Sequence, residues 1–181
     1  MNLNSPIPNS ISPSASASTS ASTKPSSIRS LIMAGLVLGL GQGGFFDGII
    51  FHQLLQWHHM FSSVATDRTI AGIELNTIGD GLFHLLNWVL TLVGIGLLWK
   101  AGRQVQNNWS GQLFMGALLM GMGLFNLIEG ILDHHILGIH HLKPGIHQGL
   151  WDIGFLLSGV ILVAIGWLMI GIHRSKSAKE V

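Results

Sequence analysis

The sequence predicts an all-α integral membrane protein: a four-helix bundle built from two repeated helical hairpins. Of its 181 residues, 48% are hydrophobic and only 9% are charged, whereas soluble domains average roughly 25% charged residues. Four apolar segments follow a polar tail, and each is long enough for a spanning helix. The polar residues of the first segment recur in the third, which indicates an internal repeat.

The composition excludes several function classes. The 9 basic and 8 acidic residues give a net charge of +1, so we expect no electrostatic surface for nucleic acid. The chain has no cysteine, which excludes disulfides, thiolate metal sites, iron–sulfur clusters and cysteine nucleophiles. It does have 10 histidines. The chemistry that the composition favours is therefore that of imidazole and carboxylate groups.

Two polar tails flank the apolar region. Residues 1–30 are mostly Ser, Ala, Thr, Pro and Asn, and none of them is acidic. Such a segment cannot bury enough apolar surface to offset its ordering entropy, so we expect it to be disordered. A targeting peptide is the alternative interpretation. At the other end, residues 173–181 are expected to form a short basic tail in the cytoplasm.

The membrane domain is expected at residues 31–172. A spanning helix needs roughly 20 residues, and the four apolar segments cover residues 31–60, 79–100, 111–141 and 145–172. The first and third exceed that length, so we expect them to tilt or to project beyond the hydrocarbon. A closed β-barrel would need many alternating strands of about ten residues, and the sequence has no such pattern.

The basic residues predict the orientation of the spans. Seven lie on one side of the predicted spans and two on the other, so the positive-inside rule places both termini in the cytoplasm. The side that carries most of the histidines then faces outward. The seven are Lys24, Arg29, Lys100, Arg103, Arg174, Lys176 and Lys179, and the two are Arg68 and Lys143.

The first and third segments match when one is shifted by 82 positions. Two copies of a helical hairpin share one orientation, so we expect a pseudo-two-fold axis along the membrane normal that brings equivalent polar groups face to face. The second and fourth segments match more weakly at an offset of 68, which aligns His84 with Asp152. The pairs at the offset of 82 are Asp47 with Glu129, His52 with His134, His58 with His140, and His59 with His141.

Ionisable residues gather toward the predicted outer half of the membrane, where nine of the ten histidines lie. A charge in hydrocarbon costs several kcal/mol, so such groups usually face the protein interior and serve a function. In a regular α-helix, Asp47 and His58 share one face about 16 Å apart, and His52 and His59 share a second face. The candidate metal ligands are Asp47, His52, His58, His59, Asp80, His84, Glu129, Asp133, His134, His140, His141, His147 and Asp152.

Four of these residues form the expected centre, and three more complete it. Imidazole and carboxylate ligands without thiolate suit Fe, Cu, Zn or Mn. A haem held between His52 and His134 is the alternative cofactor. Two structural interpretations stay open as well: hydrogen-bonded core imidazoles, and an ion pair or helix cap for the acids. The expected centre is Asp47, His52, Glu129 and His134, completed by His84, His147 and Asp152.

Three long motifs carry a resemblance to a known family. They lie at residues 44–60 (GFFDGIIFHQLLQWHHM), 76–84 (NTIGDGLFH) and 125–141 (FNLIEGILDHHILGIHH). They resemble the signature of a bacterial family of predicted membrane proteins, domain of unknown function 2243, over residues 31–172. The resemblance implies the multi-pass architecture, the polar positions and a bacterial inner membrane, but no reaction. An association of such genes with oxidase assembly factors implies respiratory oxidase components as partners.

Three functional hypotheses follow, and whether the protein is an enzyme stays open. The leading hypothesis is a bilayer protein that binds one or two transition-metal ions, for redox chemistry on a lipid or quinone. The second is metal or haem handling for the assembly of a respiratory oxidase. The third is transport of protons or cations through the intramembrane acids. Because four spans are few for a pathway, a transporter would be a homo-oligomer.

Overall fold

The computed structural model describes residues 25–104 and 109–179, and the elements in these residues are all helical. Each of the four long helical runs is long and apolar enough to cross a membrane. The predicted all-α class and the four spans are therefore confirmed. The elements are α1 (Pro25–Asp47), η1 (Gly48–Leu54), α2 (Ile70–Gln104), α3 (Gly111–Glu129), η2 (Gly130–Ile136) and α4 (Gln148–Lys179), where η denotes a π-helix.

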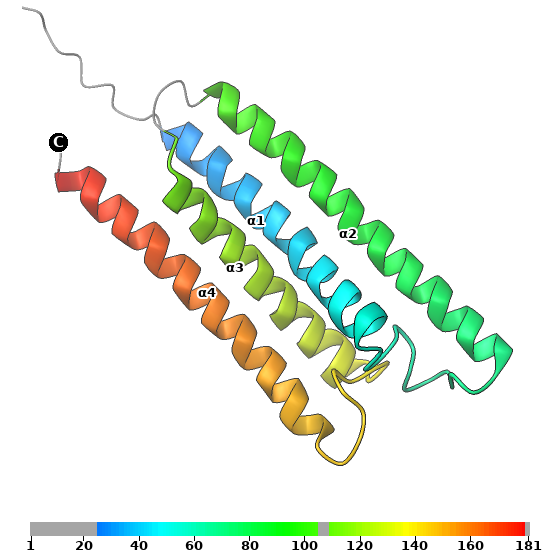
Figure 1. Ribbon diagram of the computed structural model, residues 1–181. Coiled ribbons are helices and arrows are strands. Elements are labelled where there is room, and N and C mark those ends of the chain that lie inside the picture. Colours follow the sequence, from blue (N-terminus) through cyan, green and yellow to red (C-terminus); the bar gives the residue numbers. More distant parts are fainter. Residues whose placement is uncertain (1–24, 105–108, 180–181) are drawn as a thin grey trace, which may run out of the picture.

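The four long helices lie side by side in one row, in the order α2, α1, α3, α4 (Figure 1). Helix α1 packs against α2 and α3, helix α3 packs against α1 and α4, and within the described residues α2 and α4 make no contact. This row differs from a closed bundle, in which the outer helices would also meet. Large apolar side chains on the outer helices, such as Leu86 and Leu157, are exposed, as expected for helices that face lipid.

Glycine allows the two central helices to approach closely. A Cβ atom built on Gly39 of α1 would lie 2.9 Å from the Cα atom of Gly121 in α3. One on Gly35 would lie 2.7 Å from the Cβ atom of Ala117. The backbones therefore touch where any side chain would separate them, a packing mode common between membrane helices. Glycine at these positions therefore serves the close packing of α1 on α3.

Several boundaries differ from those expected. Helix α1 begins at Pro25, so residues 25–30 are helical, and the rest of the predicted disordered tail lies outside the described residues. Helix α2 begins at Ile70, nine residues before the expected start of the second span. The first and third helical runs end early, at Leu54 and Ile136. The residues that directly follow Leu54 and Ile136 are therefore not helical, although the expected spans included them.

Two π-helices and two left-handed turns explain the early ends. The π-helices η1 and η2 begin directly after Asp47 and Glu129, at positions 82 residues apart. Beyond them, Gln56 has φ 49° and Gly138 has φ 58°, a left-handed conformation that turns the chain away from the helix axis. The two segments after these turns, residues 57–69 and 139–147, are here called the return loops. They carry the paired histidines at positions 58–59 and 140–141.

Candidate metal centre

The return loops fold back against the ends of the helices that they leave. His58 and His140 are consequently buried, with exposed fractions of 2% and 0%. On a straight helix His58 would lie about 16 Å from Asp47, but its Nε2 atom lies 3.9 Å from Asp47 Oδ2. The expected spacing of these two residues is therefore wrong, because the chain turns after η1.

Four buried side chains meet at this end of the row: His52, His58, Glu129 and His140. Each offers one nitrogen or oxygen atom, and these four atoms lie within 4.8 Å of one another. Helix η1 supplies His52, the last residue of α3 supplies Glu129, and the return loops supply the other two rings. Three imidazoles and one carboxylate could together hold a metal ion. We refer to these four residues as the His–Glu cluster.

Hydrogen bonds fix the orientation of the three rings. His58 donates from Nδ1 to the carbonyl oxygen of Leu142 at 2.8 Å, and His140 donates from Nδ1 to that of Met60 at 3.1 Å. His52 Nδ1 bonds to Asp80 Oδ1 at 2.8 Å. A proton held on Nδ1 leaves the lone pair on Nε2. The Nε2 atoms of His58 and His140 have no hydrogen-bond partner, and that of His52 faces Asp47 Oδ2 at 3.1 Å. This is how metal-binding histidines are oriented.

The two acids at the helix ends face the imidazoles of the cluster. Asp47 is 1% exposed and Glu129 is 4% exposed, and no backbone amide or hydroxyl group of the described residues donates to either side chain. Within the described residues, their ion-pair contacts are to histidines. Asp47 Oδ2 lies 3.1 Å from His52 Nε2, and Glu129 Oε1 lies 3.5 Å from His140 Nε2. The acids therefore point at the same space as the Nε2 atoms.

A second pair of acids tethers the return loops. Asp80 of α2 accepts hydrogen bonds from His59 Nδ1 at 2.7 Å and from the Met60 amide at 2.8 Å, in addition to the bond with His52. Such carboxylates behind the ligands raise the basicity of the rings and hold them in place.

Asp152 of α4 makes equivalent contacts in the other half. It accepts hydrogen bonds from His141 Nδ1 at 2.7 Å and from the Leu142 amide at 2.9 Å, and it lies 3.2 Å from His134 Nδ1. Asp152 is thus the counterpart of Asp80, at an offset of 72, and the expected alignment of His84 with Asp152 is wrong. That alignment relied on small and apolar residues, whereas the contacts pair the two carboxylates.

The remaining candidates lie around the cluster. His134 is buried, and its ring centroid lies 4.9 Å from that of His140. Asp133 is partly buried on η2, and His147 is exposed. His84 bonds through Nδ1 to the carbonyl oxygen of Asp80 in its own helix at 2.7 Å. The structure therefore brings His134 next to the cluster and places His84 and His147 outside it.

Burial keeps His58 and His140 neutral. Loss of solvation lowers the pKa of the His58 ring to about 4, against an opposing effect from Asp47. Loss of solvation also lowers the pKa of His140 far below its usual value, and the nearby rings of His58 and His134 add to this effect. Both rings are therefore neutral at pH 7, the form in which imidazole binds metal ions.

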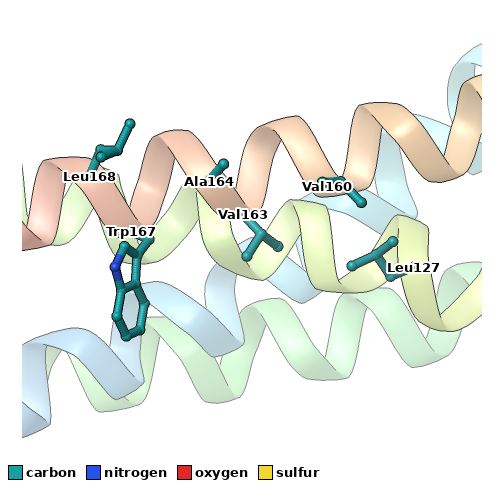
Figure 2. Close-up of a pocket in the computed structure, with 6 residues that line it drawn as sticks. All are labelled: Leu127, Val160, Val163, Ala164, Trp167 and Leu168. Carbon is teal, nitrogen blue, oxygen red and sulfur yellow. The ribbon is translucent and has the colours of Figure 1, made fainter.

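Side chains of α3 and α4 line an apolar groove (Figure 2), and none of the lining residues belongs to the cluster. Its walls consist of aliphatic side chains and one indole, so its chemistry suits a hydrocarbon chain. Leu127, the α3 residue in the groove lining, lies two positions before Glu129 in the sequence. The lining residues are Leu127, Val160, Val163, Ala164, Trp167 and Leu168.

A family model described as "Predicted membrane protein (DUF2243)" matches residues 34–173. The match spans the four helices and both return loops, and it confirms the resemblance seen in the three motifs. Neither the curated proteins nor the solved structures gave a match to the chain. The family description supplies no reaction, so the chemistry has to be argued from the site.

Proposed function

The chain belongs to this family of predicted membrane proteins, and we propose that it binds a transition-metal ion through the His–Glu cluster. One observation carries the proposal. Four potential ligand atoms lie within 4.8 Å of one another in a buried site, and the Nε2 atoms of His58 and His140 and both Glu129 oxygens there lack hydrogen-bond partners. A single cation at this point would bind all of them.

Energetics favour a cation over a purely structural polar core. A buried polar atom without a partner costs roughly 1–3 kcal/mol, and a charged one costs more. The cluster contains two such nitrogens, on His58 and His140, and the two oxygens of Glu129, while His52 Nε2 faces the Asp47 carboxyl group. Hydrogen bonds already occupy the Nδ1 atoms on the outer sides of the rings. The unsatisfied atoms are thus concentrated on one side of each ring, the side that a metal ion would occupy.

The ligand types indicate which metal to expect. Neutral imidazoles with a carboxylate suit Fe, Cu or Zn. The ring centroids of His58 and His140 are 4.6 Å apart, and those of His52 and His58 are 4.4 Å apart. Such close packing leaves little room for a haem between the histidines, so it favours a bare ion.

Burial of the ligands favours a retained metal over a transient cargo. The four ligands are between 0% and 4% exposed, so ion exchange requires that a return loop open. We therefore rank redox chemistry on a lipid or quinone above metal delivery to a respiratory oxidase. Proton or cation transport is the third candidate, and it predicts pH-driven flux in liposomes.

The proposed location follows from the charge distribution. We propose that the cluster lies toward the outer side of a bacterial inner membrane, with both termini cytoplasmic, because seven of the nine basic residues lie on the side of the termini. A reporter fused after Val181 tests this orientation. Activity of a cytoplasm-specific reporter is expected, and activity of a periplasm-specific reporter would overturn the assignment.

Elemental analysis with an absorption spectrum tests metal binding. The protein would be purified in mild detergent without a His tag, beside His140→Ala and the exposed control His147→Ala. We expect stoichiometric Fe, Cu or Zn in the wild type and in the control, and its loss in His140→Ala. Absence of metal from the wild type, even after reconstitution with each ion, would refute the proposal.

A further inference from the structure

Two further ligands adjoin the His–Glu cluster without belonging to it. Asp47 and His134 are 1% and 2% exposed. Asp47 Oδ1 and His134 Nε2 lack hydrogen-bond partners, whereas Asp47 Oδ2 lies 3.1 Å from His52 Nε2 and His134 Nδ1 lies 3.2 Å from Asp152 Oδ1. Asp47 approaches the cluster at His52, and the His134 ring approaches it at His140. One ion on the cluster leaves this carboxylate and this imidazole unused.

The two halves of the chain contribute equivalent ligands. His58 and His140 are counterparts at the offset of 82, and both belong to the cluster. The counterpart of His52 is His134, and the counterpart of Glu129 is Asp47. The unused pair is thus the set that completes the symmetry: four imidazoles and two carboxylates in all.

Buried acids gather around the centre. Asp47, Asp80, Glu129 and Asp152 are each at most 4% exposed and lie at the same end of the row. A carboxyl group is costly to bury unless hydrogen-bond donors or a cation accompany it, so this end of the row suits bound cations.

We propose that the centre is dinuclear, with a second transition-metal ion bound by Asp47 and His134 beside the first. This inference rests on the proposed function, because it adds an ion to the same site. Six side chains then serve two ions, and each of the two inner carboxylates has two oxygens with which to bridge them. Two metal ions bridged by a carboxylate lie about 4 Å apart or less. At that separation two paramagnetic ions interact.

The metal-to-protein ratio tests the second ion. Metal-free protein in detergent is loaded with Co²⁺, desalted, and analysed for cobalt and protein. The variant is His134→Ala, and its matched control is His135→Ala, the neighbouring exposed residue on η2, whose Nδ1 bonds to the Gly130 carbonyl. We expect two ions per chain in the wild type and control, and one in His134→Ala.

The outcomes separate the two proposals. One ion in the wild type, unchanged in His134→Ala, would overturn the second ion and leave the proposed function standing. No ion in the wild type would overturn both.

A spectroscopic measurement on the wild type avoids dependence on a variant that fails to fold. Cu²⁺ is added to the metal-free protein in two equivalents, and the paramagnetic resonance signal is quantified at each. For a dinuclear centre we expect the signal per copper to fall at the second equivalent, because neighbouring ions couple. A signal that doubles, with no sign of coupling, would overturn the proposal.

Discussion

The rings of His58 and His140 stack with their centroids 4.6 Å apart and their planes 7° apart, and each return loop holds the ring of the other. His58 donates to the Leu142 carbonyl, and His140 donates to the Met60 carbonyl. The two loops are thus joined reciprocally across the centre of the row. Displacing either loop would release a ring of the other, so we expect the loops to order and open together.

The turn at Gly138 should control one of these loops. A Cβ atom there would meet nothing within 4 Å, but φ is 58°. Gly138→Ala should therefore lower stability by about 1 kcal/mol through backbone strain alone, and it should weaken metal binding through His140. Thermal unfolding in detergent measures the first effect, and chelator competition measures the second.

The control for Gly138→Ala is Gly149→Ala, where a Cβ atom is equally free and the glycine is helical. Gln56 is the equivalent residue of the other turn, and its substitution by glycine should change stability in the opposite direction. Because Gln56 already carries the strain at φ 49°, Gln56→Gly should raise stability slightly. Equal effects of Gly138→Ala and Gly149→Ala would contradict the role of the turn.

The carboxylate of Asp80 should tune the metal without binding it. Asp80 accepts from two histidines and one backbone amide. Asp80→Asn removes the charge behind His52 with little change in shape, so metal affinity should fall by roughly 10- to 100-fold. The number of ions bound at saturation should stay the same. The exposed Asp67→Asn is the matched control, and loss of stoichiometry in Asp80→Asn would argue that Asp80 is itself a ligand.

Close packing of α1 on α3 gives a prediction about stability. A Cβ atom on Gly39 would lie 2.9 Å from the Cα atom of Gly121, so Gly39→Ala should separate the backbones and destabilise the protein by about 1–3 kcal/mol. Gly96→Ala adds its methyl where nothing lies within 4 Å and should have little effect. Unfolding of the two variants in a detergent titration gives the comparison, and equal stabilities would refute the packing argument.

The spans could be predicted because hydropathy dominates a membrane helix. The ionisable residues stood out because they are costly in hydrocarbon. Their spatial arrangement could not be predicted in the same way, since it depends on η1, η2 and the turns at Gln56 and Gly138. Gly138, two residues before His140, was a signal for such a turn. Its counterpart, Gln56, has a side chain that seldom adopts positive φ, so the other turn had no clear sequence signal.

The arrangement of the helices could not be predicted from the sequence pattern either. Two hairpins can pack as a closed bundle or as a row, and both expose apolar side chains to lipid. The sequence match that aligned His84 with Asp152 gave an offset of 68. The hydrogen bonds instead make Asp80 the counterpart of Asp152, because His59 donates to Asp80 as His141 donates to Asp152. Contacts between distant residues decide such a correspondence, and in so apolar a helix the sequence offers few polar markers for it.

The low pKa of His58 predicts how the metal-free protein responds to acid. Burial lowers this pKa to about 4, below its value of 6.5 in the unfolded chain, so folding favours the neutral ring. The stabilising contribution is complete above pH 6.5 and is lost progressively as the pH falls toward 4. We expect His58→Gln to be less sensitive to pH than the wild type across this interval, whereas His147→Gln should follow the wild type. Unfolding of the metal-free proteins in detergent between pH 7.5 and 4.5 checks this, and parallel curves for all three would refute the assigned pKa of His58.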